Sequence, residues 1–236
     1  MSATIRGVGQ MTAGNQTAEL DWTDGCVPVS SRFGDPYFSR GGGLGETRHV
    51  FLAGNGLPGR FRPGFHIAEL GFGTGLNMLA SLMAWRETGP SGPLRYTSFE
   101  VCPMTAADIG RALSAFPEVA EVRAGFLAQW AAGCRQIRLP GLEADIIIGD
   151  AANILGPWPG RADAWFLDGF SPARNPELWT DRLMAQVAAH TNAGGTFATY
   201  TAAGCVRRAL ALAGFAVERR PGFGPKRHMT AGSLSA

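Results

Sequence analysis

The sequence has few of the features that mark membrane, secreted or metal-binding proteins. No apolar run approaches the length of a membrane-spanning helix, because Gly, Arg or Asp interrupts the longest of them. The first twenty residues contain no apolar core typical of a signal peptide. The four cysteines are scattered without a Cys-x-x-Cys pair, and the four histidines form no ligand motif. We therefore expect a cytoplasmic protein with no disulfide framework, no metal and no membrane partner.

Phosphate-binding motifs are missing as well. The sequence contains no G-x-x-x-x-G-K-[S/T] loop. Its glycine loop, ELGFGTGLN, has Gly71, Gly73 and Gly75, whereas a dinucleotide-binding loop would place its third glycine at the position of Leu76. These differences disfavour NAD, ATP and GTP as ligands, and with them a nucleotide-linked oxidoreductase.

The segments that are present predict an α/β protein. With 45% hydrophobic and 17% charged residues, a chain of 236 residues can bury a sizeable core. Apolar runs predict strands at 65–70, 94–101, 144–151, 163–170, 194–201, 215–220 and 228–234. Between them, helical patterns cover 76–88, 105–116, 176–191 and 202–214. This alternation predicts a mostly parallel sheet with helices on both faces and a C-terminal antiparallel strand pair.

The chain before residue 65 has a different character. Residues 1–20 predict a flexible lead-in, and residues 21–64 predict an extension of hairpin-like strands and turns that packs on the main domain, residues 65–236. Within the extension, GGGLG predicts a flexible loop. Tyr37 and Phe38 are candidate platforms for a base, although we expect them to pack the extension onto the sheet.

Acidic residues stand at the ends of the predicted strands. Glu100 can accept both hydroxyls of a ribose, and Asp150 with its neighbouring backbone can read an adenine amine. Glu69, just before the glycine loop, suits a cation better than a pyrophosphate. A nucleoside with a positive charge and no phosphates matches S-adenosylmethionine, although such acids also cap helices. The candidate cofactor residues are Glu69, Gly71, Gly73, Gly75, Asn77, Glu100, Val101, Asp150, Ala151 and Asp168.

Asp168 ends the predicted strand in DAWFLDGFSPARNPELW. Methyl transfer to nitrogen needs a neutral amine held near the methyl carbon. A carboxylate there can orient the amine and take its proton, and Phe170 can form a wall against the substrate. Asp168 and Phe170 are therefore the candidate catalytic residues. The alternative is that Asp168 caps the following turn and Phe170 belongs to the core.

Several stretches together resemble a known family. FLDGFSPARNPELW, ATYTAAGCVRRALALAGF, GFGPKRHM, SSRFGDPYFS and GLGETRHVFLAGN are similar to the methyltransferase domain of the bacterial bifunctional tRNA 5-methylaminomethyl-2-thiouridine biosynthesis family, over residues 20–232. The resemblance implies a Rossmann-like class I methyltransferase fold. It also implies that S-adenosylmethionine methylates the 5-aminomethyl group of a tRNA wobble uridine. A small-molecule amine N-methyltransferase and a non-catalytic binding module are the alternatives.

The resemblance also concerns partners. Bifunctional members carry a C-terminal flavin-dependent oxidase domain, which this sequence does not include. Two expectations follow: either the protein is a stand-alone methyltransferase with a separate oxidase acting upstream, or the sequence is only part of a longer protein. Residues 181–236 hold seven basic and two acidic residues, which suits an anionic partner such as tRNA, although a solvated basic face would look the same. The candidate RNA-binding residues are Arg174, Arg207, Arg208, Lys226 and Arg227.

Overall fold

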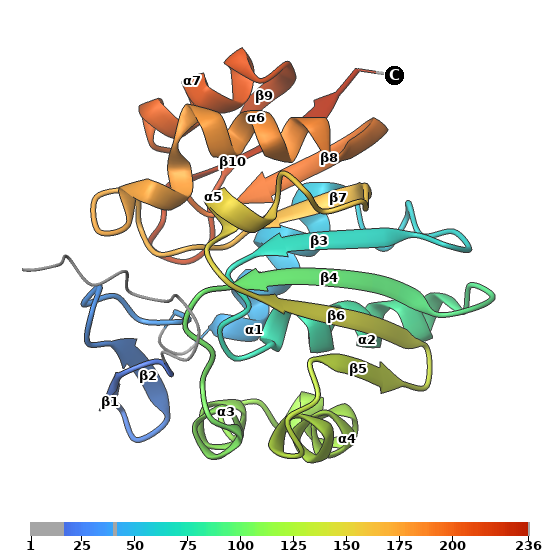
Figure 1. The fold of residues 1–236 in the computed structure, drawn as a ribbon, viewed down its shortest axis with the longest axis vertical. Coiled ribbons are helices and arrows are strands. Elements are labelled where there is room, and N and C mark those ends of the chain that lie inside the picture. Colours follow the sequence, from blue (N-terminus) through green and yellow to red (C-terminus); the bar gives the residue numbers. More distant parts are fainter. Residues whose placement is uncertain (1–16, 40–41, 236) are drawn as a thin grey trace, which may run out of the picture.

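The computed structural model describes residues 17–39 and 42–235, and its centre is one eight-stranded sheet (Figure 1). The strands lie in the order β5-β6-β4-β3-β7-β8-β10-β9. The five inner strands from β6 to β8 run parallel, whereas β5 pairs antiparallel with β6, and β10 antiparallel with β8 and β9. The bounds are β3 His66–Leu70, β4 Leu94–Glu100, β5 Gln136–Leu139, β6 Leu142–Ile148, β7 Ala162–Leu167, β8 Thr191–Thr199, β9 Phe215–Pro221 and β10 His228–Leu234. The predicted fold class, with its C-terminal antiparallel pair, is confirmed.

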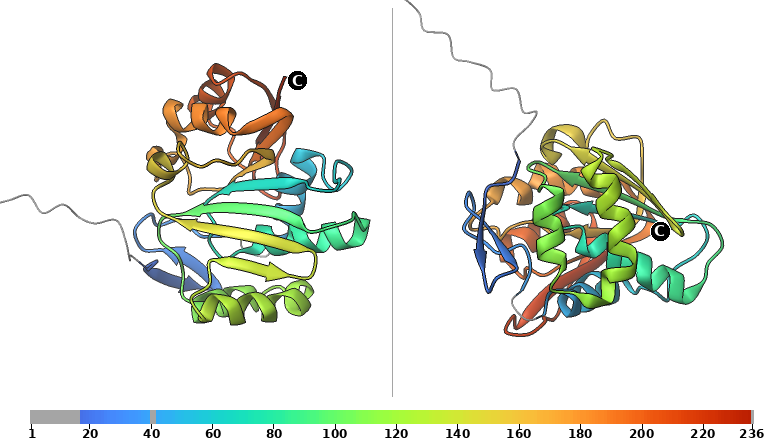
Figure 2. Two further views of the ribbon diagram at one scale, coloured as in Figure 1. Left: turned by 45° about the vertical axis from the view of Figure 1, so that its right-hand side comes forward. Right: turned by 90° about the horizontal axis from the view of Figure 1, so that it is seen from below.

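Helices cover both faces of the sheet because alternate strand residues point to opposite sides. Ile67 and Phe166 face one core, and their neighbours Ala68 and Trp165 face the other. Helices α2 (Leu76–Thr88), α3 (Ala106–Leu113) and α4 (Ala120–Ala131) cover the first core, and α5 (Ala151–Ile154), α6 (Asp181–Ala189) and α7 (Gly204–Leu212) cover the second. Figure 2 shows α3 and α4 side by side near β5.

The N-terminal extension contains the expected hairpin. Strands β1 (Leu20–Thr23) and β2 (Val27–Ser30) pair antiparallel in a separate two-stranded sheet. Arg111 of α3 holds this hairpin, because its guanidinium stacks 3.9 Å from the ring centroid of Trp22 and donates to the carbonyl of Gly25. Most of the predicted lead-in, residues 1–20, lies outside the described residues.

Three segments differ from the sequence-based expectation. The prediction of a flexible loop at GGGLG is wrong for residues 43–45, which begin α1 (Gly43–Glu46); α1 continues as a π-helical turn over Thr47–Leu52. Glycine is needed there for close packing, since a Cβ on Gly45 would come within 2.8 Å of the Phe223 ring. The sequence also did not predict α4 or β5. The expected helix 176–191 is split, because Thr180 caps a new helix at Asp181.

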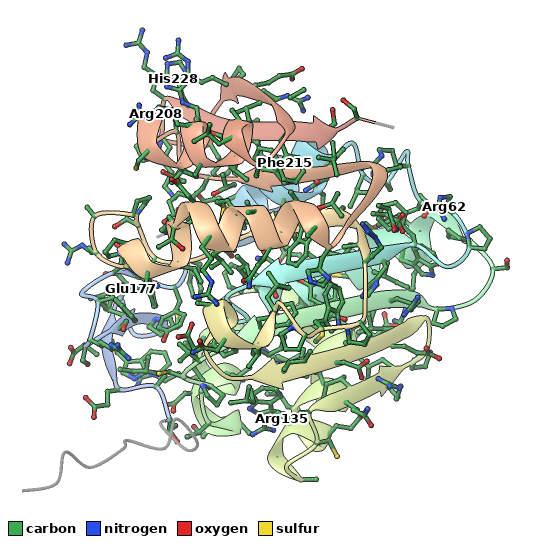
Figure 3. All side chains as sticks on the ribbon, turned by 45° about the horizontal axis from the view of Figure 1, so that its top comes forward. Arg62, Arg135, Glu177, Arg208, Phe215 and His228 are labelled. Atoms are coloured by element: carbon green, nitrogen blue, oxygen red, sulfur yellow. The ribbon has the colours of Figure 1, made fainter. Side chains whose placement is uncertain are left out.

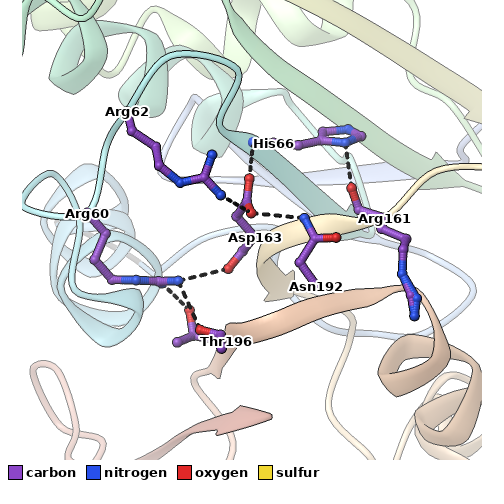
Figure 4. Close-up of polar contacts among 8 residues, drawn as sticks. Arg60, Arg62, His66, Arg161, Asp163, Asn192 and Thr196 are labelled. Carbon is purple, nitrogen blue, oxygen red and sulfur yellow. Dashed lines mark hydrogen bonds and ion pairs between the residues drawn. The ribbon is translucent and has the colours of Figure 1, made fainter. Parts of the chain in front are cut away.

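A polar network fixes the amino ends of β3 and β7 (Figure 4). The carboxylate of Asp163 accepts hydrogen bonds from Arg62, the backbone N–H of His66 and the amide of Asn192. Arg60 donates to the Asp163 carbonyl and to Thr196. The network ties the segment before β3 to the sheet, at the strand ends opposite the site described below. Within the described ranges, no helix is long and apolar enough to cross a membrane.

Candidate active site

A cavity of about 630 Å³ opens at the carboxyl ends of β3, β4, β6 and β7. The sheet places it there because parallel strands end together and the loops that follow them leave a crevice. Nine of the residues predicted as catalytic or cofactor-binding line it: Gly71, Gly73, Asn77, Glu100, Val101, Asp150, Ala151, Asp168 and Phe170. Glu69 and Gly75 lie behind this lining, and among the predicted RNA-binding residues Lys226 alone is part of it.

The glycine loop connects β3 to α2 through backbone that only glycine adopts easily. Gly71 has φ +87°, and a Cβ on it would lie 2.0 Å from the carbonyl oxygen of Asp168. Its N–H donates to the carbonyl of Phe99 at 2.9 Å. The loop thereby brings the ends of β3, β4 and β7 together and leaves bare backbone facing the cavity.

Glu100, at the end of β4, shapes this loop and faces the cavity at the same time. One carboxylate oxygen accepts from the N–H of Gly73 at 3.0 Å and the other from the N–H of Cys102 at 2.8 Å. Burial raises the pKa of the Glu100 carboxyl. Each oxygen has a second lone pair, so both can still accept a ligand hydroxyl.

Asp150 combines a structural role with a place on the wall. Its carboxylate caps α5 by accepting from the N–H of Ala152 at 3.0 Å and from the amide of Asn153 at 3.1 Å. Helix capping, the alternative considered from the sequence, is therefore correct for this residue, and Asp150 still lines the cavity beside Ala151.

A buried amide joins two carboxylates at the base of the cavity. Asn77 Nδ2 donates to Glu69 at 2.9 Å and to Asp168 at 2.7 Å, and its oxygen accepts from Thr47 at 2.8 Å. Glu69 is fully buried and also accepts from Ser98 at 2.7 Å. Because Glu69 does not line the cavity, its influence on a ligand is indirect, through the hydrogen bonds of Asn77 to Glu69 and Asp168.

The two carboxyl groups are not fully ionised near neutral pH. Burial raises the pKa of Asp168 to about 7, although the hydrogen bond from Asn77 favours its charged form. Burial, and then the charge of Asp168, raises the pKa of Glu69 to about 8. A half-buried carboxylate with a pKa near 7 can accept a proton and release it again at neutral pH.

Aromatic side chains form the wall next to Asp168. The ring centroid of Phe170 lies 4.8 Å from that of Phe33 and 4.9 Å from that of Tyr37. Asp35 accepts from the N–H of Ser171, so the segment after β2 is held against the loop after β7. The expectation that Tyr37 only packs the extension is therefore incomplete. Phe38 packs on Phe116 and also borders the cavity.

Sequence reasoning missed several polar groups in the wall, of which Glu46 makes the strongest contacts. Glu46, at the end of α1, is buried and pairs with Lys226 at 2.6 Å, while Ser39 donates to its other oxygen. The Lys226 ammonium lies 4.1 Å from the ring centroid of Tyr200, whose hydroxyl donates to the carbonyl of Gly169. GLGETRHVFLAGN carried the signal, because Glu46 lies in that stretch.

The charge of the cavity decides which ligands it fits. Among the residues that the structure describes, the lining contains two basic side chains, Arg32 and Lys226, and six acidic ones: Asp35, Glu46, Glu100, Asp150, Asp168 and Glu177. A pyrophosphate would be repelled there, whereas a sulfonium or ammonium would be attracted. The bare glycine loop and this donor set fit S-adenosylmethionine. In the described part of the chain, no group of three or more His, Cys, Asp or Glu side chains could hold a metal ion.

The remaining predicted RNA-binding residues lie outside the cavity. Arg207 and Arg208 lie on α7, and Arg227 lies in the loop before β10. Figure 3 shows Arg208 and His228 at the end of the molecule formed by α7 and β10. Arg174 donates to the carbonyl of Phe33 and so helps to hold the aromatic wall.

Comparison with known proteins identifies the family. A family profile described as S-adenosyl-L-methionine-dependent methyltransferase matches residues 117–235. The chain is 48% identical to the tRNA 5-methylaminomethyl-2-thiouridine biosynthesis bifunctional protein MnmC of Caulobacter vibrioides, with 88% of this chain and 36% of the relative covered. It is 45% identical to MnmC of Hahella chejuensis, covering 93% and 37% respectively.

A solved structure agrees with these relatives. The crystal structure of MnmC2 from Aquifex aeolicus matches with a TM-score of 0.75 and 26% identity, over 94% of this chain and 72% of that one. The chain spans little more than a third of the length of the curated relatives it matches, and the matched part is their methyltransferase part. It belongs to the S-adenosyl-L-methionine-dependent methyltransferase family.

Proposed function

We propose that this protein methylates the amine of 5-aminomethyl-2-thiouridine at the wobble position of tRNA, with S-adenosylmethionine as the methyl donor. The observation that carries the proposal is Asp168, a carboxyl of pKa about 7 at the end of β7 in an acidic cavity walled by aromatic rings. The names of the MnmC relatives supply the substrate class, since they denote biosynthesis of the methylated product.

The cofactor side of the cavity is assigned to the loops after β3, β4 and β6. In this assignment the backbone at Gly71 and Gly73 allows close approach, Glu100 accepts the ribose hydroxyls, and Asp150 with Ala151 contacts the adenine. Val101 lies next to Glu100 on the same wall. When bound, S-adenosylmethionine supplies a methyl group on a positively charged sulfur, which the acidic lining favours.

Asp168 is proposed to prepare the amine. A primary ammonium has no lone pair for methyl transfer until it loses a proton, and Asp168 can accept that proton. Asn77 fixes the position of the carboxylate with a 2.7 Å hydrogen bond. Phe170, with Phe33 and Tyr37, is proposed to hold the base so that its aminomethyl group points at Asp168.

The proposal includes the division of the chain into an N-terminal extension and a catalytic domain. Residues 65–236 form the catalytic domain, and the extension, residues 21–64, completes its substrate side by contributing Phe33, Tyr37 and Glu46 to the wall. For RNA binding we propose Arg174, Arg207, Arg208 and Arg227 as phosphate contacts. Action in the cytoplasm beside a separate flavin-dependent oxidase remains a prediction.

Methyl transfer from labelled S-adenosylmethionine to tRNA carrying 5-aminomethyl-2-thiouridine tests the function directly. We expect label in 5-methylaminomethyl-2-thiouridine after digestion to nucleosides. If a control tRNA with unmodified uridine at this position receives no label, the aminomethyl group is the acceptor. Equal rates on tRNA and on small alkylamines would favour the small-molecule methyltransferase instead. Absence of transfer by a protein that binds S-adenosylmethionine would exclude the proposed substrate.

A further inference from the structure

Lys226 occupies an unusual place for a lysine. It is the one lysine in a sequence with twenty arginines, and its ammonium points into the acidic cavity. The loop between β9 and β10 brings it there, 180 residues along the chain from its partner Glu46. Glu46 contacts it at 2.6 Å, and the face of Tyr200 lies 4.1 Å away.

These contacts form a recognition site for a primary ammonium. A carboxylate supplies a charge-assisted hydrogen bond and an aromatic face supplies a cation–π contact. The end of a lysine side chain, a CH₂ group carrying an ammonium, is chemically the same group as the aminomethyl substituent of the proposed substrate. A guanidinium, planar and wider, would not reproduce it, although arginine is otherwise the basic residue of this chain.

We propose that Glu46 and the ring of Tyr200 form the subsite for the substrate's primary ammonium, and that Lys226 is a displaceable stand-in for it. The inference rests on the proposed function, because it assigns the amine of that substrate to one place in the cavity. Asp168, the proposed proton acceptor, borders the same cavity as this subsite.

Glu46 and Lys226 differ in mobility, as displacement of Lys226 by a substrate requires. The Glu46 side chain is 10% exposed and stays fixed by Ser39, whereas the Lys226 side chain is 38% exposed on a loop. The Lys226 side chain can therefore swing toward water or toward an RNA phosphate, where its ammonium is again solvated or paired. Glu46 cannot follow, and a buried carboxylate left without a cation is costly.

The exchange therefore gives selectivity. A wobble uridine that carries an aminomethyl group replaces one ammonium by another, and Glu46 remains paired. An unmodified uridine brings no cation, so displacement of Lys226 would leave Glu46 unpaired. The subsite thereby discriminates by charge against tRNA that has not yet received its amine. The competing explanation is that Lys226 is a fixed tether between the β9–β10 loop and α1.

Because Lys226 is the only lysine, ¹³C-labelled lysine places the label at a single side chain and allows a direct test. In the free protein the Tyr200 ring should shift the εCH₂ proton resonance upfield. Saturation with 5-aminomethyl-2-thiouridine nucleoside should return that resonance to the position of a solvated lysine. The nucleoside 2-thiouridine, which has no amine, should leave it unchanged. A resonance that stays shifted in the presence of bound aminomethyl nucleoside overturns the proposal.

Calorimetry on two variants gives an independent readout. Lys226→Met keeps the length of the side chain and vacates the subsite, so it should bind the aminomethyl nucleoside roughly tenfold more tightly than the parent protein. Glu46→Gln in the Lys226→Met background should remove that gain. Binding by Lys226→Met that is undetectable, or no tighter than the parent's, contradicts the subsite. A single cooperative melting transition well above the temperature of the titration, in each variant, would exclude misfolding as the cause.

The two proposals fail separately. Displacement of Lys226 by the nucleoside without methyl transfer to tRNA would leave the ammonium subsite intact and reject the tRNA function. Methyl transfer to tRNA with an undisplaced Lys226 would reject the subsite alone.

Discussion

Asp168 is the residue on which the proposed chemistry depends most directly. Asp168→Asn keeps the shape and the contact with Asn77 but cannot accept a proton from the amine. We expect kcat for methyl transfer to fall by a factor on the order of 10², with binding of S-adenosylmethionine retained. Steady-state kinetics and calorimetry measure the two quantities. Asp145→Asn, at a half-exposed position outside the cavity lining, is the matched control and should leave both unchanged.

The pKa of Asp168 also predicts a pH profile. The carboxylate form is the active one, so activity should rise with pH and level off above about pH 7, where Asp168 is ionised. This dependence should be lost in Asp168→Asn. A parent profile that is flat between about pH 5 and about pH 8 would show that another group or water takes the proton.

Glu69 predicts how stability depends on pH. Burial and the nearby Asp168 raise its pKa to about 8 in the folded protein, so the folded state holds a proton that the unfolded chain has already released. The contribution of Glu69 to the free energy of unfolding should therefore decrease as pH rises from about 5 to about 8, by on the order of 3 kcal/mol. Denaturant titrations at several pH values measure this.

Two variants separate the contribution of Glu69 from that of other groups. Glu69→Gln, which cannot ionise, should make the decrease in unfolding free energy smaller, and the raised pKa of Asp168 accounts for a further part of it. The exposed Glu121→Gln should retain it. An unchanged slope in Glu69→Gln would assign the effect to another group.

The helices and strands that carry each site residue determine whether that residue could be predicted from the sequence. Apolar strands that end in Glu100, Asp150 and Asp168 are visible in the sequence, and the parallel sheet brings their ends together. By contrast, Glu46 lies in a glycine-rich stretch that looks flexible, and its helical conformation depends on packing against Phe223. Tertiary contacts between distant segments decided the conformation there, and no local pattern records them.

The turn between β3 and α2 can be tested at Gly71. An alanine at position 71 would have to adopt positive φ and would place its Cβ 2.0 Å from a backbone oxygen. Gly71→Ala should therefore lower the free energy of unfolding by on the order of 3 kcal/mol and weaken S-adenosylmethionine binding. Gly89→Ala, at the end of α2, also has positive φ but no atom within 4 Å of its Cβ. This control should lower the free energy of unfolding by about 1 kcal/mol and leave S-adenosylmethionine binding unchanged. Urea denaturation measures both free energies of unfolding. Equal decreases in Gly71→Ala and Gly89→Ala would show that the close approach of Gly71 to the Asp168 carbonyl has no specific role.

The whole molecule separates an acidic cavity from a basic end. Acidic side chains predominate in the cavity, and Arg207, Arg208 and Arg227 lie outside it on α7 and beside β10. Under the proposed function, the RNA backbone and the reacting base would therefore contact different surfaces. This arrangement could not be predicted from sequence, because the charge asymmetry along the chain does not show which basic residues face the cavity. Lys226 faces it, whereas the three arginines do not.

The basic end predicts how tRNA binding responds to salt. Arg208→Ala combined with Arg227→Ala should weaken tRNA binding and reduce the slope of log K against log salt concentration by about one for each phosphate that is no longer neutralised. Methylation of the free nucleoside should not change, since neither residue lines the cavity. Arg135→Ala, at the opposite end of the molecule in Figure 3, is the control. An unchanged salt slope in the double variant would move the RNA surface elsewhere.

The strand order has a consequence for the synthesis of this protein. Strand β10 follows β9 in sequence but lies between β8 and β9 in the sheet. As the chain leaves the ribosome, β9 therefore emerges before the strand that will join it to the sheet, and its edge remains unpaired until β10 arrives. The loop that carries Lys226 joins these two strands, so the Glu46–Lys226 pair cannot form earlier. A nascent chain should gain its complete binding cavity only when β10 has been synthesised and inserted.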